Sequence, residues 1–344
     1  MSAGARARID TVVEFLGPAL LIVLVAVIGS FTSAAREIEF RNALVNAAIV
    51  IALYVFIGNS GVISFGHISF VAVGAFLAGV ITIEGQSKQF VLPNLAPFLK
   101  HATIGSWASL GLAAAVGAAY ALIVGIPLMR LSGLPAGIAT FAVLGITYNV
   151  LRYWDAIGPG PLTLSLVPET TTIWVACGGT LIAAAVAFTY QKSRAGRMLR
   201  ATREDPGAAR AAGIDVYRQR LLAFTLSGAL AGFAGGLLVH LFGSITTDQV
   251  YLNLTFITLA MLVIGGVASL LGATLGALLV SGLNSFLSDA ENGVDIGFHL
   301  KLRGGTSFVV LGIFMALVLI LRPSGITGGR ELRLPRRRRP VTKR

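Results

Sequence analysis

Charged residues are scarce in this sequence: Asp, Glu, Lys and Arg make up 12% of its 344 residues, whereas a soluble domain carries about 25%. Hydrophobic residues account for 55% of the chain, and the mean hydropathy is +0.82. This composition makes lipid the expected solvent. Because each crossing needs about 20 apolar residues, the length allows roughly ten helices and leaves little room for a soluble domain.

Cysteine and the lysine of a nucleotide-binding loop are also lacking. Cys177 is the only cysteine, so no internal disulfide and no cysteine-based metal site can form, and we expect a small buried side chain. A P-loop needs a lysine directly after a glycine, and no lysine in the chain follows one. We therefore expect no metal, no cofactor and no ATP on this chain, and an energy source in another protein or in a gradient.

Ten uninterrupted apolar runs predict an all-α polytopic membrane protein of about ten transmembrane helices. The runs lie near 15–32, 43–59, 67–83, 106–129, 133–151, 172–190, 221–242, 252–268, 270–287 and 306–321. They contain no Asp, Glu, Lys or Arg, and their only histidines are His67 and His240. A proton-driven carrier commonly keeps such groups in its bundle, so that class is disfavoured, whereas a sodium ion held by backbone carbonyls stays open. Dense glycine around Gly58, Gly61 and Gly66 indicates a re-entrant or broken segment.

The positive charges predict the orientation of the chain. With ten crossings, 20 of the 27 Lys and Arg residues fall on the side of the loop at 191–220. The positive-inside rule therefore places both termini in the cytoplasm. We expect a cytoplasmic N-terminus at 1–14, a transmembrane permease domain at 15–328 that contains this loop, and a basic cytoplasmic tail at 329–344.

The net charge of +12 does not predict nucleic-acid binding, because the basic residues lie in loops and in the tail. We expect Arg336–Arg339 to meet anionic lipid headgroups. Arg6 and Arg8 before the first run permit a second interpretation, a cleavable signal. The acidic Asp10 and Glu14 favour a retained helix.

Glycine recurs every four residues in two of the runs, at Gly228, Gly232 and Gly236, and at Gly272 and Gly276. This spacing lets helix backbones approach closely. We expect tight helix packing at these glycines rather than contact with a solute.

The loop at 191–220 contains the features of a short capped helix between Glu204 and Gly213. Asp205 can accept hydrogen bonds from the first amides, Pro206 suits the first helical position, and Gly213 suits a left-handed stop. An ordinary surface helix is one interpretation. A coupling helix, which would seat in a cleft of a soluble ATPase, is the other.

The same loop resembles the EAA loop of bacterial ABC import permeases, in which a glycine follows Glu-Ala-Ala at a fixed distance. The matching residues are Glu204, Ala208, Ala209 and Gly213. Here Asp205-Pro206-Gly207 separates the acidic residue from the alanines, which is similar to the branched-chain amino acid subfamily.

Further stretches, in the family order from about 41 to 328, resemble the LivM-type permease of the branched-chain amino acid ABC transporter family. They are 61–70 with 74–76, 223–232 with His240 and Asp248, 265–272, and 322–325. The segment from Gly61 to His67 is similar to the signature Gly-Gln-x-Ser-x-Gly-His. Val62 stands where the family usually has Gln, and Ala268 where it usually has Gly, and both departures bear on the substrate.

The resemblance implies a permease subunit of an ABC importer in the bacterial cytoplasmic (inner) membrane. Its partners would be a second homologous permease, two cytoplasmic ATPases that bind the ATP, a periplasmic solute-binding protein and membrane lipid. Contact with the ATPases is expected at Glu204, Asp205, Ala208, Ala209 and Gly213. A translocation pathway is expected at Ser64, Gly66 and His67. The solute stays open among leucine-like and other amino acids, urea and amides.

Two other classes stay open. A gradient-driven carrier or channel for a small neutral solute would fit charge-free spans, but it leaves the capped loop helix without a role. A membrane enzyme would need catalytic groups at the lipid boundary, and the candidate cluster is Asp289, Glu291, Asp295 and His299. A solvated outer loop is the better interpretation of that cluster.

Overall fold

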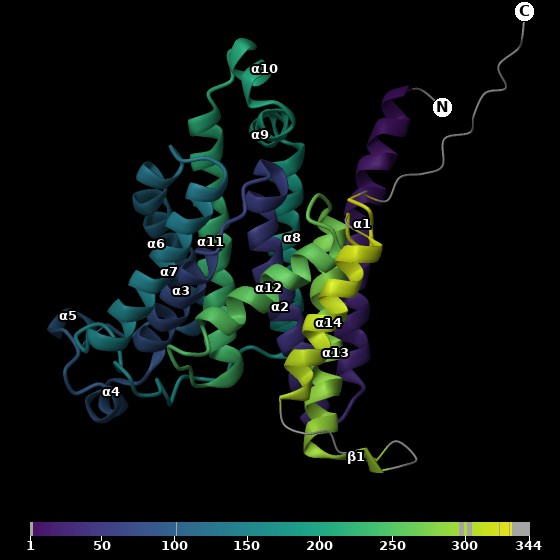
Figure 1. The fold of residues 1–344 in the computed structure, drawn as a ribbon. Helices are drawn as coiled ribbons and strands as arrows, with labels where there is room; N and C mark the ends of the chain where they lie inside the picture. The colour runs from purple at the N-terminus through teal and green to yellow at the C-terminus, as the bar shows by residue number, and fades with distance from the viewer. Residues whose placement is uncertain are drawn as a thin grey trace, which may run out of the picture.

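The computed structural model describes residues 3–100, 102–295, 299–300, 305–322, 324–329 and 331, and these residues are nearly all helical (Figure 1). The helices are α1 (Ala3–Ser30), α2 (Ala34–Ser60), α3 (His67–Thr82), α4 (Gly85–Val91), α5 (Pro97–Lys100), α6 (Ser106–Leu128), α7 (Leu134–Tyr153), α8 (Ile173–Lys192), α9 (Arg194–Glu204), α10 (Pro206–Ala211), α11 (Val216–Phe242), α12 (Leu252–Gly265), α13 (Leu270–Asn292) and α14 (Thr306–Leu321). Two short antiparallel strands, β1 (Val294–Asp295) and β2 (His299–Leu300), pair between α13 and α14.

Each of the ten apolar runs lies in a helix, which confirms the all-α membrane fold. Among the described residues, seven helices are long and apolar enough to cross a membrane, namely α1, α2, α6, α7, α8, α11 and α13. The other three runs form the shorter apolar helices α3, α12 and α14. The number of crossings therefore stays a prediction. The helices also extend past the runs, because α2 begins at Ala34 and α11 at Val216.

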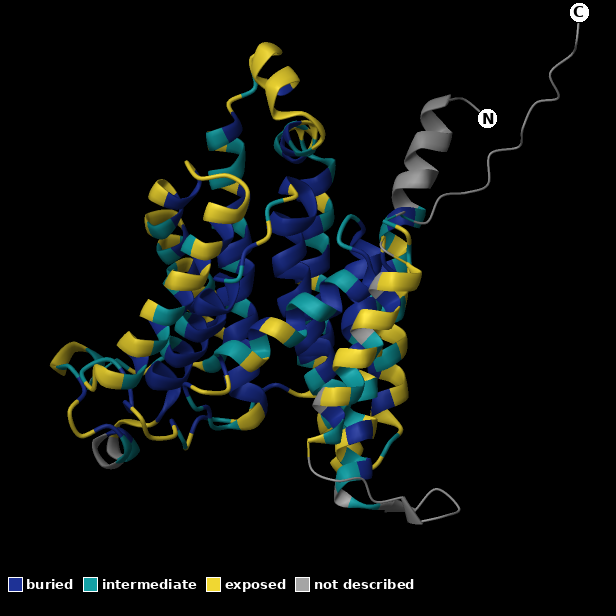
Figure 2. Ribbon diagram, viewed as in Figure 1, coloured by how far each residue is buried: buried dark blue, intermediate teal, exposed yellow. Residues whose placement is uncertain are grey.

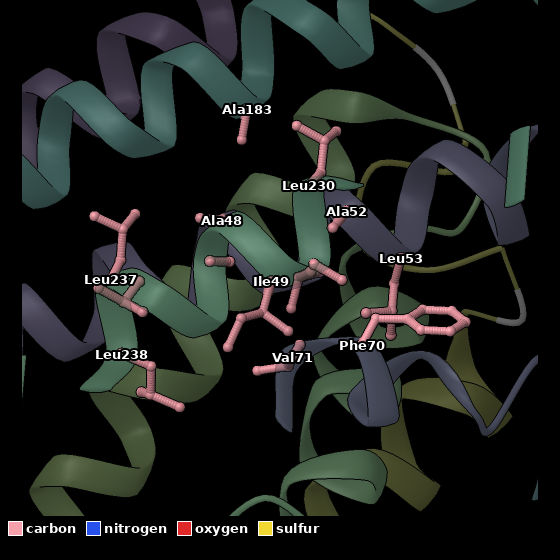
Figure 3. Packing of buried hydrophobic residues seen from close by; sticks show 14 of the residues in the cluster. Ala48, Ile49, Ala52, Leu53, Phe70, Val71, Ala183, Leu230, Leu237 and Leu238 are labelled. Carbon is pink, nitrogen blue, oxygen red and sulfur yellow. The ribbon is translucent and has the colours of Figure 1, made fainter. Parts of the chain in front are cut away.

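Helix α2 lies at the centre of the bundle. Its residues from Ala43 to Ser60 are all buried, and Figure 2 shows it as a dark blue rod inside more exposed helices. Ala48 and Ile49 of α2 lie in one apolar cluster with Ala183 of α8 and Leu237 of α11 (Figure 3). A bilayer solvates apolar side chains as well as the interior of the bundle does, so the burial of apolar surface alone does not hold these helices together. The close fit of one helix surface against another contributes instead.

The regularly spaced glycines bring helices into backbone contact. A Cβ on Gly74 of α3 would lie 2.2 Å from the carbonyl oxygen of Gly232 of α11, and one on Gly117 of α6 would lie 2.5 Å from that of Gly228. A Cβ on Gly276 of α13 would lie 2.0 Å from the carbonyl oxygen of Met261. These distances confirm the tight packing predicted from the spacing.

Glu14, near the start of the chain, and Glu331, the last described residue, both lie at the end of the bundle that carries α9 (Figure 1). Glu14 of α1 forms an ion pair with Lys192 of α8. Glu331 accepts a hydrogen bond from the Leu270 amide, 2.7 Å away, at the start of α13. Burial raises the pKa of the Glu331 carboxyl, and the amides of α13 oppose that rise. The remainder of the predicted tail at 332–344 lies outside the described residues.

Candidate coupling loop and broken segment

The loop at 191–220 folds as two short helices, of which the first, α9, was not predicted. The Ser193 hydroxyl accepts a hydrogen bond from the Gly196 amide at 3.1 Å and caps α9. Gly196, Leu199 and Thr202 are buried, so α9 packs one face on the bundle. The signal that identifies α9 in the sequence is this apolar face between arginines spaced by three residues, which is typical of an amphipathic helix.

The second helix, α10, is the predicted capped helix. Asp205 Oδ1 accepts hydrogen bonds from the amides of Gly207 at 2.7 Å and Ala208 at 3.0 Å. Pro206 is the first helical residue, and Gly213 adopts a left-handed φ of 79°. Asp205, Pro206 and Gly213 thus take the local roles expected from their chemistry.

Helix α10 projects past the ends of the long helices, as Figure 1 shows, and is coloured almost entirely as exposed in Figure 2. Four of the five residues predicted to contact an ATPase are exposed: Glu204, Asp205, Ala208 and Gly213. Ala209 is buried. The structure therefore presents a short, capped and mostly exposed helix to the space beyond the bundle.

Arg203, which the sequence did not single out, joins α9 to the end of α2. Its Nη1 donates a hydrogen bond to the carbonyl oxygen of Gly58 at 2.7 Å. Its Cγ lies 2.9 Å from where a Cβ on Gly61 would be. Gly61 itself ends α2 with a left-handed φ of 70°. Arg203 thus connects α9 to the point where α2 ends and the broken segment at 61–66 begins.

The three predicted pathway residues lie together at the start of α3, but the side chains of Ser64 and His67 are buried within the subunit. The Ser64 hydroxyl and His67 Nδ1 are 2.8 Å apart, and both residues are 1% exposed. The His67 ring lies among three aromatic rings with centroids 5.2 to 5.7 Å away, those of Phe56, Phe70 and Phe224. A Cβ on Gly66 would lie 2.5 Å from the Thr140 carbonyl oxygen, so the segment packs closely on α7.

The outer side of the same segment carries apolar side chains. Ile63 is 57% exposed. The half-buried Phe65 packs edge-to-face on Phe141 of α7 and Phe256 of α12, with centroids 6.2 and 6.4 Å apart. Ser64 and His67 are thus buried beneath the outer surface that Ile63 and Phe65 form.

The other candidate groups have structural partners. His240 contacts Ser109 Oγ through Nε2 at 2.9 Å and the Pro168 carbonyl through Nδ1 at 3.0 Å. Glu291 accepts a hydrogen bond from the Ser307 amide at 2.6 Å and so caps α14. The side chains of Asp295 and His299, which complete the proposed acidic cluster, lie outside the described residues. Within the described ranges, no three His, Cys, Asp or Glu side chains are placed to hold a metal ion.

The two positions that depart from the family pattern lie near the same end of the bundle. Val62 is half-buried against the apolar core. The Ala268 Cβ lies 3.2 Å from where a Cβ on Gly329 would be. Neither departure introduces a polar group that could contact a solute.

Comparisons with known proteins agree on one family. The model described as "Branched-chain amino acid transport system / permease component" matches residues 42–321. The permease protein LivM of Salmonella typhimurium is 25% identical over 89% of this chain and 73% of its own length. A probable LivH permease of Methanocaldococcus jannaschii is 35% identical over 40% of this chain and 42% of its own. The autoinducer 2 import permease LsrC of Klebsiella pneumoniae is 32% identical over 55% of each chain. No solved structure matches the chain significantly.

Proposed function

This chain belongs to the permease components of branched-chain amino acid transport systems, and we propose that it moves a branched-chain amino acid or a similar small solute, with ATP hydrolysed by separate subunits. It is a multi-pass protein of the cytoplasmic membrane and a transport component of the ABC import type. The solute and the coupling to ATP are the proposed parts.

The observation that carries the coupling proposal is the exposed, capped helix α10. A lever must be rigid, must protrude, and must be tied to the part that it moves. Asp205 and Gly213 fix both ends of α10. Arg203, directly before Glu204, ties the preceding helix to Gly58 of α2. ATP-driven closure of a partner could therefore act through α9 on the centre of the bundle.

We propose two cytoplasmic ATPase subunits, a second homologous permease and a periplasmic solute-binding protein as partners. A conduit must favour inward-facing or outward-facing states according to the nucleotide state of the ATPases, so the permease contributes differential affinity between states rather than tight binding. A gradient-driven carrier gives no role to a helix that protrudes beyond the bundle. The relatives named as autoinducer 2 permeases leave room for a solute other than an amino acid.

Co-purification tests the coupling proposal. Tagged wild-type chain extracted from its native membrane under mild conditions should recover two ATPase subunits. The double variant Glu204→Lys, Gly213→Arg should lose them, because it reverses an exposed charge and places a side chain at a φ of 79°. The control Glu84→Lys makes the same charge change before α4, at the opposite end of the bundle, and should keep them. Recovery of folded wild-type chain without any ATPase would contradict the proposal.

A further inference from the structure

The broken segment at 61–66 enters the depth of the membrane-spanning helices. Gly61 lies beside Arg203 at the coupling end. Gly66 packs on Thr140, the seventh residue of α7, which is about 9 Å along that helix at 1.5 Å per residue. The segment between them is not helical. On its outer side Ile63 is 57% exposed and Phe65 contacts rings of α7 and α12.

The backbone of this segment has few hydrogen-bond partners among the residues that the structure describes. The Val62 amide donates to Ser60 Oγ and the Phe65 amide to Thr140 Oγ1. The carbonyl oxygens of residues 62–65 accept no hydrogen bond from any residue that the structure describes. Lipid cannot supply a donor, so non-helical backbone at this depth is tolerated only where protein covers it or where it lines a water-filled cavity.

The exposed faces of the bundle differ in the polar side chains that they carry. Exposed side chains on α1 and α14 at membrane depth are aliphatic, such as Leu24 and Ile313. The face formed by α7 and α12 exposes Ile138 and Ile146, and toward its outer end it also exposes two amides, Asn149 of α7 and Asn253 of α12. Polar side chains within spans face a bundle interior or a water-filled cavity far more often than lipid.

At the outer end of the same face, polar groups form a network. Arg152 of α7 pairs with Asp248 at 2.9 Å. Tyr148 donates to the same carboxylate at 2.6 Å and stacks on Tyr251 with ring centroids 4.0 Å apart. The polarity of this face thus decreases from the charged groups at its outer end to the aromatic rings of Phe141 and Phe256.

We infer that the exposed surface formed by Ile63, Phe65, Phe141 and Phe256, here called the aromatic wall, lines the aqueous path of the solute and contacts an aliphatic side chain. This inference rests on the proposed function and makes its substrate class more specific. Aromatic rings offer apolar contact area, and these four side chains carry no charge. The aromatic wall therefore fits a solute with a branched aliphatic group and no net charge on that group.

Thiol labelling tests whether the aromatic wall is wet. Cys177, the only cysteine, is buried and can be replaced by alanine to give a cysteine-free background. Phe141→Cys and Phe256→Cys are then compared with Leu24→Cys and Ile313→Cys, whose parent side chains are similarly exposed on α1 and α14. Each variant is treated in native membrane vesicles with a sulfonated methanethiosulfonate, which requires water, and with a lipophilic maleimide.

The two wall cysteines should react with the charged reagent at least about tenfold faster than the two controls, since a thiol in hydrocarbon does not meet the reagent. Equal rates at all four positions would overturn the inference, and so would wall cysteines that react with neither reagent, because protein would then cover them. ATPase recovery is measured on the same preparations. A dry wall with ATPases bound refutes the inference alone, whereas loss of ATPases from the unmodified chain refutes the proposed function.

Transport kinetics test the contact with an aliphatic group. In the assembled transporter, Phe256→Ala should raise the KM for leucine by roughly tenfold while the KM for glycine stays within about twofold, because a pocket loses selectivity in proportion to the apolar contact removed. Phe256→Leu should restore most of the preference. Parallel changes for leucine and glycine would show that the ring only supports the fold, and would overturn this part of the inference.

Discussion

Arg203 shows how a single side chain can connect the exposed loop to the membrane core. The guanidinium donates to the carbonyl oxygen of Gly58, two residues before α2 ends. A helix leaves its last carbonyls without intrahelical donors, so an arginine is a suitable cap for the end of α2. The aliphatic stem packs at Gly61, where a larger residue would collide with it. The same residue therefore stabilises α2 and lies next to the broken segment.

We predict that Arg203→Ala uncouples transport from ATP hydrolysis. The complex should still assemble, because α10 and its cap are untouched, but solute uptake should fall by about tenfold while ATPase activity is retained. Loss of one charge-assisted hydrogen bond of about 1.5–3 kcal/mol is sufficient for such a change. Uptake and ATP hydrolysis are measured together in proteoliposomes.

The matched control is Arg197→Ala, on the same helix. Arg197 is exposed and donates only to the nearby Lys192 carbonyl at 2.9 Å, so its loss leaves α2 unaffected. Unchanged uptake in both variants would show that α9 does not transmit force through Arg203.

Residues with local roles could be predicted from the sequence, whereas residues with distant partners could not. Asp205, Pro206 and Gly213 act within a few residues of themselves, so their chemistry fixes their roles. Arg203 contacts a residue 145 positions away, and Phe65 meets rings on α7 and α12. No periodicity of a single segment encodes such contacts.

At the scale of elements, the bundle is organised by close contacts of α11 with α3 and α6. A Cβ on Gly117 would lie 2.5 Å from the Gly228 carbonyl oxygen, and one on Gly235 would lie 2.1 Å from that of Val71. Helix spacing of this kind depends on backbone atoms, which cannot rotate away from a collision. In lipid, such van der Waals fit replaces the hydrophobic effect as the main source of helix association.

We predict opposite outcomes for two alanine substitutions on α6. Gly117→Ala should lower the free energy of unfolding by about 1–3 kcal/mol, since the added methyl group overpacks a backbone contact. Gly111→Ala adds the same group where no atom lies within 4 Å, so it should be neutral or should stabilise by up to about 1 kcal/mol through helix propensity. Denaturation in mixed micelles measures both, and equal effects would contradict the packing account.

The helices themselves were predictable because lipid demands apolar runs, but their ends were not. Helix α2 continues through Glu37 and Arg41, which pair with each other at 2.5 Å on its outer turns. A search for uncharged runs stops before such residues. Helix α9 was not predicted because its arginines interrupt any uncharged run, although Leu199 and Thr202 form a buried side.

At the scale of the whole molecule, Glu14 and Glu331 make contacts on the same side of the bundle as α10 (Figure 1). Glu14 pairs with Lys192, which precedes α9. Glu331 binds the start of α13. Val267 lies three residues before α13 begins, and its carbonyl oxygen is 2.6 Å from where a Cβ on Gly58 would be. If the seven long and the three shorter apolar helices all span the membrane, the number of crossings is even, which agrees with this arrangement.

We predict that fusions will place both termini in the cytoplasm, on the side where 20 of the 27 Lys and Arg residues are expected. Green fluorescent protein fused to either end should fluoresce, and alkaline phosphatase fused to the C-terminus should be inactive. Phosphatase inserted at the exposed Pro93–Asn94, at the opposite end of the bundle, should be active and serves as the control. If α3, α12 and α14 did not cross, the seven remaining helices would put the termini on opposite sides. An active C-terminal phosphatase together with a fluorescent N-terminal fusion would therefore reject ten crossings and, with them, the cytoplasmic placement of the C-terminus.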